Sequence, residues 1–162
     1  MLHGGMRILV FVAAGGSWLV AGVFFAFSTF VMAALARVSA ERGIPVMQAI
    51  NATVINPAFM LAFLGTALAS AVLAASSLKP SAVMADRLIL AAGLVYLLGG
   101  IGVTMVCNVP MNDALATLQP SSDGASAFWR DYLDRWTAWN HVRAIATAAA
   151  AFLFTLAYSL WP

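Results

Sequence analysis

The stretch Arg135-Trp-Thr-Ala-Trp-Asn-His-Val-Arg143 decides how this chain folds, because it opens an apolar run that continues to Trp161. Read as a helix, the stretch places Trp136, Asn140 and Arg143 at positions i, i+4 and i+7, and therefore on one face. That face carries an indole ring, an amide and a guanidinium at the start of a segment that otherwise suits lipid. Polar groups in lipid need bonding partners, so we expect the rest of the chain to supply them.

The composition of the 162-residue chain indicates an integral membrane protein. The chain is 63% hydrophobic and only 9% charged, with a mean hydropathy of +0.93, whereas an ordinary soluble domain carries about 25% charged residues. A net charge of +2 without any run of Lys or Arg does not suggest nucleic-acid binding. A chain of this length is expected to form a single domain, residues 1–162.

Four segments are long and apolar enough to cross a bilayer, which takes about 20 residues each. They cover approximately residues 8–35, 57–76, 88–107 and 139–160. The first is far longer than the apolar core of a signal peptide, about 7–15 residues, so we expect it to be a retained membrane helix. The sequence therefore predicts an all-α fold, a four-transmembrane-helix bundle with both termini on the same side.

The connections between these segments are unequal. Residues 77–87, which contain Lys79-Pro80, predict a tight hairpin. The two longer connections predict helix extensions beyond the membrane, on the side opposite the termini. One extension ends at a break at Asn56-Pro57, and the other runs directly into the last apolar segment. We expect the two extensions to pack on each other.

The positive-inside rule gives two answers for the orientation of the chain. The total number of Lys and Arg residues favours the long connections inside, whereas their density in short segments beside helix ends favours the termini inside. We adopt the second interpretation, in the cytoplasmic membrane of a bacterium with both termini in the cytoplasm. A homo-oligomer is compatible with these features.

Arg143 is the least expected residue, because it lies inside the apolar run that begins at Trp139. An arginine at the centre of a bilayer costs about 2.5–3.5 kcal/mol on insertion scales. Near a helix end it costs less, since its long side chain can reach the interface. Two interpretations therefore stay open: a snorkelling or structurally bonded arginine, and a residue that binds an anion or a carbonyl group in a closed pocket.

Asparagines are the candidate partners of Arg143. Asn108 and Asn112 lie at the end of the third apolar segment, and Asn56 directly precedes Pro57. Asn140 shares the helical face of Arg143 itself. Structural alternatives exist, since Asn56 before a proline is a typical helix N-cap and Asn108 can satisfy backbone groups freed at a helix end. The convergence of these amides with Arg143 at one depth predicts a small polar pocket at the mouth of the bundle.

The chain offers few ligands for a metal. It has two histidines, His3 and His141, one cysteine, Cys107, and no acidic residue inside an apolar segment. This set cannot supply a zinc or di-iron site, a thiolate cluster or an intrachain disulfide, so we expect no metal. For His141 three interpretations stay open: a structural histidine at the interface, a general base or hydrogen-bonding group, and an axial ligand of a haem.

These residues resemble the anthrone oxygenase-like family of small four-helix membrane proteins. The resemblance covers nearly the whole chain and is carried by Gly22-Val-Phe-Phe-Ala-Phe-Ser-Thr-Phe-Val31, Met47-Gln-Ala-Ile-Asn51, Asn56-Pro57, Asn108-Val-Pro-Met-Asn112 and Trp136-Thr-Ala-Trp-Asn-His-Val-Arg143. The last two stretches are the most specific. The resemblance implies the oxidation of an anthrone to an anthraquinone by dioxygen, with no cofactor expected.

The resemblance also implies roles for the candidate residues. An anthrone is a flat tricyclic ketone whose enolate reacts directly with dioxygen. The enolate oxygen would be stabilised by Arg143 with an asparagine amide, Asn140, Asn108 or Asn112. His141 would remove the proton, although neighbouring positions on a helix point about 100° apart. Contacts to the ring system would come from Trp136, Asn112, Asn56, Phe27 and Trp139.

A second hypothesis comes from a different class of protein. It is a non-catalytic membrane module that binds a lipid, a quinone or a haem, in which the polar cluster holds helix ends together. Trp139 then belongs to the aromatic belt at the membrane interface, and Trp136 packs in the core.

Overall fold

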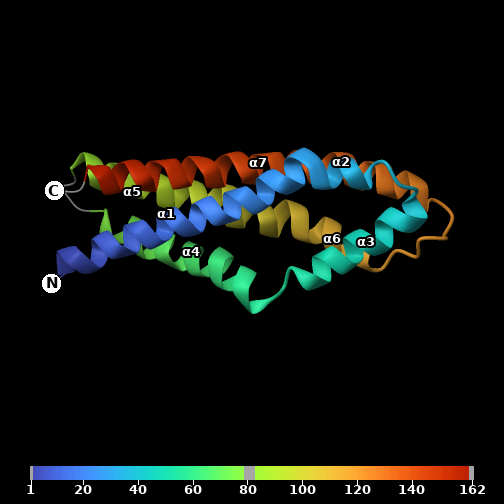
Figure 1. The fold of residues 1–162 in the computed structure, drawn as a ribbon, viewed down its shortest axis with the longest axis horizontal. Helices are drawn as coiled ribbons and strands as arrows, with labels where there is room; N and C mark the ends of the chain where they lie inside the picture. Colours follow the sequence, from blue (N-terminus) through green and yellow to red (C-terminus); the bar gives the residue numbers. More distant parts are fainter. Residues whose placement is uncertain (1, 79–82, 161–162) are drawn as a thin grey trace.

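In the computed structural model, which describes residues 2–78 and 83–160, the chain forms an elongated bundle of helices (Figure 1). In order along the chain these are α1 (Leu2–Ala26), η1 (Phe27–Val31), α2 (Met32–Leu35), α3 (Ala40–Thr53), α4 (Pro57–Ser76), α5 (Met84–Val95), η2 (Tyr96–Gly102), η3 (Thr104–Asn108), α6 (Val109–Ala116) and α7 (Ala125–Ser159), where η marks a π-helical segment. The described residues contain no strand.

Four continuous helical stretches are long and apolar enough to cross a membrane: Gly4–Leu35, Pro57–Ser76, Met84–Ala116 and Ala125–Ser159. The predicted all-α bundle of four spanning helices is thereby confirmed. The start of α1 and the end of α7 lie at the same end of the bundle, while α3, α6 and the start of α7 lie at the other (Figure 1). That these last elements extend beyond the membrane stays a prediction. The expected hairpin at Lys79-Pro80 lies outside the described residues.

At the end of the bundle that holds the termini, the helices are in close contact because their facing side chains are small. Ala13, Ala69, Ala92 and Ala157 belong to one buried apolar cluster there. A Cβ atom added at Gly93 of α5 would lie 2.8 Å from the backbone oxygen of Ser70 in α4. Without a hydrophobic driving force between helices in lipid, such close packing is what holds a bundle together.

The first and third long helices contain π-helical segments towards the other end of the bundle. In the third helix, η2 and η3 follow one another across a glycine-rich stretch, and η3 ends two residues before Pro110. A proline inside an α-helix removes a hydrogen bond and clashes with the carbonyl group one turn earlier, and a wider turn gives that carbonyl group room. The helix consequently continues through Pro110 to Ala116.

The second long helix begins at a corner rather than as a continuation of α3. Pro57 occupies the first turn of α4, and the Oδ1 atom of Asn56 accepts a hydrogen bond of 3.0 Å from the backbone N–H of Phe59. The Nδ2 atom of Asn56 donates to the oxygen of Thr53 at 3.0 Å. Asn56 therefore acts as the N-cap of α4 and fixes the corner between α3 and α4.

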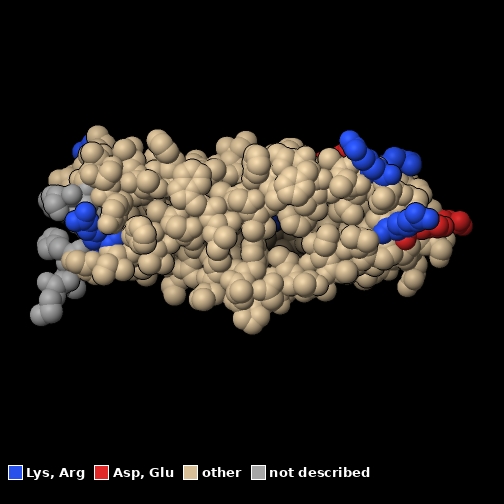
Figure 2. Space-filling view, in the orientation of Figure 1, with Lys and Arg blue, Asp and Glu red and all other residues tan. Residues whose placement is uncertain are grey.

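The surface agrees with a protein that lies in a membrane. Figure 2 shows positively charged side chains at both ends of the face in view and negatively charged ones towards the end away from the termini, with an almost uncharged surface between them. Exposed side chains of the four long helices include Phe11, Leu61 and Val106, each more than 60% exposed. Such an apolar girdle between two charged ends is expected for contact with lipid chains.

Candidate functional site

A cavity of about 420 Å³ lies where the two π-containing helices face the α3–α4 corner and α7. Its walls are mainly aliphatic and aromatic, and its polar lining residues are Asn51, Thr104, Asn112 and Arg143. The volume falls within the range of about 300–1,000 Å³ that is usual for small-molecule sites. Four residues proposed from the sequence as a site line this cavity together: Phe27, Asn112, Trp136 and Arg143.

Arg143 is held in this wall by α7 and by two neighbouring helices. Its side chain is only 5% exposed. Its Nη2 atom donates to Asn140 Oδ1 at 2.7 Å, and its Nη1 atom donates to Thr104 Oγ1 at 3.3 Å. The guanidinium carbon lies 4.3 Å from the ring centre of Phe24 and 4.9 Å from that of Trp136. The cation is therefore placed between two aromatic faces, which attract it.

The charge of Arg143 has no anionic partner in the described part of the chain. Its hydrogen-bond acceptors are a neutral amide and a hydroxyl group, and its buried Nε atom has no acceptor among the described residues. A buried charge without a counter-ion is costly. An oxygen with negative charge on a ligand in the cavity would relieve that cost.

Asn140 links α7 to the first helix and orients the Arg143 side chain from the side that faces away from the cavity. Its Nδ2 atom donates to the backbone oxygen of Phe24 and to Ser28 Oγ, both at 2.8 Å, while its Oδ1 atom accepts from Arg143. Asn140 is fully buried and does not line the cavity. Phe24 lies just before η1, and a π-helical turn disturbs the usual backbone pairing near it, so an amide donor at this carbonyl group is well placed.

Asn112 presents its N–H₂ group at the cavity wall. Its Oδ1 atom accepts two hydrogen bonds, from Tyr132 Oη at 2.9 Å and from Trp136 Nε1 at 2.8 Å. Asn51 Nδ2 in turn lies 3.5 Å from Tyr132 Oη. Because two donors bind this atom, it is the amide oxygen, and the other amide atom is the nitrogen. The Nδ2 atom has no acceptor among the described residues. A ligand in the cavity would therefore meet a free amide donor as well as Arg143.

Asn108 lies one helical turn before Asn112 but has a different environment. It is fully buried, and its Nδ2 atom donates to the backbone oxygen of Trp136 at 3.2 Å. Its Oδ1 atom has no donor among the described residues. Asn108 does not line the cavity, so it ties the third helix to α7 beside the site.

The family model for anthrone oxygenases matches residues 50–153, more than half of the chain. The chain belongs to the anthrone oxygenase family. The resemblance inferred from the sequence is thereby confirmed. The match includes Asn112, Trp136 and Arg143 but begins after the first helix, which contributes Phe24 and Phe27 to the cavity. No curated protein and no solved structure matches the chain.

Three further candidates from the sequence lie away from the wall of this cavity. Asn56 is the N-cap of α4. His141 is exposed, and Trp139 is 41% exposed. A haem with His141 as its ligand therefore does not fit this cavity, because the imidazole lies outside it.

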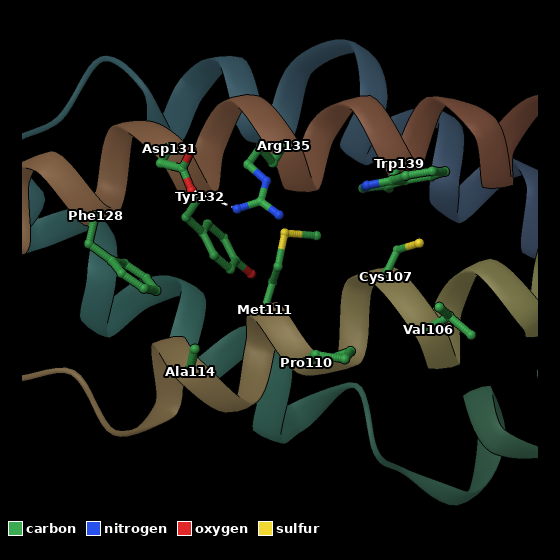
Figure 3. A pocket seen from close by; sticks show the side chains of 10 residues that line it. All are labelled: Val106, Cys107, Pro110, Met111, Ala114, Phe128, Asp131, Tyr132, Arg135 and Trp139. Carbon is green, nitrogen blue, oxygen red and sulfur yellow. Dashed lines mark hydrogen bonds and ion pairs between the residues drawn. The ribbon is translucent and has the colours of Figure 1, made fainter.

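Trp139 contributes instead to a groove of about 400 Å³ between the third helix and α7 (Figure 3). In Figure 3 its indole lies near Cys107, and Tyr132 points from α7 towards Met111 across the groove. Tyr132 lines this groove, while its hydroxyl group binds Asn112 on the cavity side. Tyr132 therefore separates the groove from the cavity.

Sequence reasoning did not select Tyr132, Thr104 or Asn51 as site residues. Tyr132 could have been found, since it lies four positions before Trp136 and thus on the same helical face. Asn51 lies in a stretch that carries the family resemblance. Thr104 carried no signal, because a threonine in an apolar helix usually bonds its own backbone, as the Oγ1 atom of Thr104 does with Gly100 at 2.7 Å.

Proposed function

We propose that this protein is a membrane-bound, cofactor-independent oxygenase of a flat apolar compound of the anthrone or phenol type. The observation that supports the proposal best is the buried guanidinium of Arg143, which has no counter-ion among the described residues and lines a mainly apolar and aromatic cavity. Membership of the anthrone oxygenase family points to the same chemistry.

The reaction needs only dioxygen as its second substrate. An anthrone loses a proton to give an enolate, which is electron-rich and transfers electron density to dioxygen. A new C–O bond forms at the ring carbon opposite the carbonyl group, and the resulting hydroperoxide loses water. One anthrone and one dioxygen thus give one anthraquinone and one water. The substrate carbon is oxidised and dioxygen is reduced, so no further reductant is required.

The role of the cavity in this proposal is to stabilise the enolate. Arg143 and the N–H₂ group of Asn112 would donate to the oxygen on which negative charge develops, and such donors are effective in a site with mainly apolar walls and a low dielectric constant. The rings of Phe27 and Trp136 would flank the substrate plane. The proposal assigns no side-chain base, because none of the described lining residues is an imidazole or a carboxylate. The proton leaves to water, and a stabilised enolate makes that loss easier.

The test is the oxidation of several anthrones by the purified protein in lipid nanodiscs. Quinone absorbance and oxygen consumption are followed together, and equal amounts are expected. Arg143→Ala should lower the rate by about 10²-fold or more, while Arg135→Ala, at an exposed position outside the cavity, should leave it unchanged. No acceleration over the uncatalysed oxidation by the wild type would overturn the proposal. A haem absorption band in an active preparation would overturn its cofactor-independent part.

A second candidate function is the binding of a quinone or a lipid without catalysis. The absence of a base among the described lining residues favours it. Under this alternative an anthraquinone quenches tryptophan fluorescence, and Arg143→Ala weakens that binding, but no anthrone is oxidised faster than in buffer.

The location also belongs to the proposal. We place the protein in the cytoplasmic membrane of a bacterium, with its termini in the cytoplasm. A reporter fused to the C-terminus that is active only outside the cytoplasm should give no signal, and a strong signal would reverse the orientation.

A further inference from the structure

Three large apolar side chains both line the cavity and are exposed on the outside of the bundle. These are Ile55, Leu64 and Met105, which are 73%, 53% and 60% exposed. They come from the α3–α4 corner, from α4 and from η3. A residue that contributes to the cavity wall and to the outer surface marks the rim of an opening. The cavity therefore reaches the outside through the flank of the bundle.

The corner between α3 and α4 is what leaves this flank open. Asn56 ends the run of α3 and starts α4 in a new direction, and in Figure 1 the corner stands away from the remaining helices. Figure 2 shows a hollow in the same part of the molecule, within the uncharged middle of the surface. Arg143 lines the cavity.

The depth of the opening can be estimated along the third helix. At a rise of about 1.5 Å per residue, Met105 lies about 27 Å from Arg87, the first cationic residue of that helix. The hydrocarbon core of a bilayer is about 30 Å thick. If Arg87 marks one edge of the core, the rim lies inside the opposite edge. Asp113, the next charged residue on this helix, lies about 12 Å further on.

We infer that the cavity is loaded from the bilayer, through a lateral opening framed by Ile55, Leu64 and Met105. The inference rests on the ligand class of the proposed function, a flat apolar ketone or phenol. An apolar rim at hydrocarbon depth disfavours a charged ligand, because such a ligand would lose its hydration before it reached any polar partner. A ligand dissolved among lipid chains has already lost that hydration. Dioxygen, which dissolves better in hydrocarbon than in water, can use the same opening.

A rim residue has a kinetic signature that differs from that of a binding residue. It touches the ligand during passage but makes few contacts with it once it is bound. Changing the width of the rim should therefore alter the association and dissociation rates by the same factor and leave Kd unchanged. Changing Arg143 or Asn112 should alter Kd.

The first experiment uses 9,10-anthraquinone, which is fully oxidised and so cannot be turned over. Its binding to the protein in nanodiscs is followed by stopped-flow quenching of tryptophan fluorescence. Met105→Phe should slow association and dissociation by roughly tenfold, which corresponds to about 1.4 kcal/mol added to the barrier, and Met105→Ala should accelerate both. The matched controls are Leu98→Phe and Leu98→Ala, at a position of the same helix that is 69% exposed and does not line the cavity. Equal rates in all four variants and the wild type would overturn the lateral opening.

The second experiment needs no ligand. Met105→Cys is made in a Cys107→Ser background and carries a nitroxide spin label, with Asp113→Cys as the control position. The label at residue 105 should collide frequently with dioxygen and rarely with a water-soluble nickel chelate, and the control label should show the reverse. A label at residue 105 that is more accessible to the chelate would show that the rim faces water, and would overturn the inference.

The two measurements separate failure of the inference from failure of the proposed function. If anthraquinone does not quench the wild type, the proposed ligand class fails, and the label accessibilities alone decide whether the rim opens to lipid. If anthraquinone binds but the Met105 variants bind it at the wild-type rates, the ligand class stands and the lateral route fails.

Discussion

The two halves of α7 belong to one continuous helix but have opposite kinds of buried face. From Thr147 to Ala157 the buried residues are mostly small, and they pack against α1 and α5. From Trp129 to Arg143 they are large and able to form hydrogen bonds: Trp129, Tyr132, Trp136, Asn140 and Arg143. The small residues of the C-terminal half let neighbouring helices approach closely, whereas the large residues of the N-terminal half hold them apart. The cavity therefore results from a change of side-chain size along a regular helix, and the hydrogen bonds of the N-terminal half stabilise the space that the change creates.

The sharpest way to break this comparison is to change a side chain that bonds to the N-terminal half of α7 while keeping its hydrogen bonds. In Asn112→Asp, the carboxylate can still accept hydrogen bonds from Tyr132 and Trp136. It loses the free N–H₂ group, places a counter-ion in the cavity that Arg143 lines, and repels an enolate. Anthrone oxidation should fall by about 10²-fold, and an unchanged circular dichroism spectrum and melting temperature serve as the control for the fold. Activity within a few fold of the wild type would remove Asn112 from the site.

The stability of the bundle around the C-terminal half of α7 should instead depend on side-chain volume. Gly93→Ala would place a Cβ atom 2.8 Å from the Ser70 oxygen and 2.9 Å from the Ala74 side chain, so α4 and α5 must move apart. We expect a loss of about 1–3 kcal/mol in the free energy of unfolding, measured by denaturation in sodium dodecyl sulfate. Gly15→Ala is the matched control, because a Cβ atom there meets nothing within 4 Å. Equal stability of the two variants would show that α4 and α5 can accommodate an added methyl group at residue 93 without moving apart.

A smaller effect is expected where the groove and the cavity meet. Tyr132→Phe removes the hydroxyl group that donates to Asn112 and accepts from Asn51. Only the hydrogen bond from Trp136 then orients the amide of Asn112. A loss of about 1 kcal/mol in stability and a drop of several fold in kcat/KM are expected. Tyr158→Phe, at the other end of α7, should change neither quantity, since that ring contacts Arg7 through its face. A similar loss in both variants would point to a general effect of the substitution.

The smallest effect should come from His141→Ala. The side chain is exposed and lies outside the cavity, so stability should change by less than about 0.5 kcal/mol, and the rate of anthrone oxidation and its pH profile should be preserved. A loss comparable to that of Asn112→Asp would restore His141 as the base and would require a different conformation of α7.

The sequence was sufficient to predict the four spanning helices and the common location of Trp136, Asn112 and Arg143. A cation in an apolar helix stands out, and the helical period tells which residues share its face. The period alone could not predict that Asn140 bonds the Phe24 carbonyl group behind the site, because that carbonyl group lies beside a π-helical segment. It also could not tell how far the groups of one helical face reach towards a cavity, which depends on packing between helices that are distant in the chain.

The π-helical segments of the third helix have a consequence for the length of the chain. A π-helical turn takes up about one residue more than an α-helical turn, and every residue adds about 100° of rotation to the part of the helix beyond it. Removing one residue from η2 or η3 should therefore convert a π-helical turn into an α-helical one, with Asn108 and Asn112 still facing Trp136. Removing one residue between Asn108 and Asn112, where the helix is α-helical, should instead turn Asn112 by about 100° away from Trp136. A relative that is one residue shorter in the π-helical segments should therefore keep the same site.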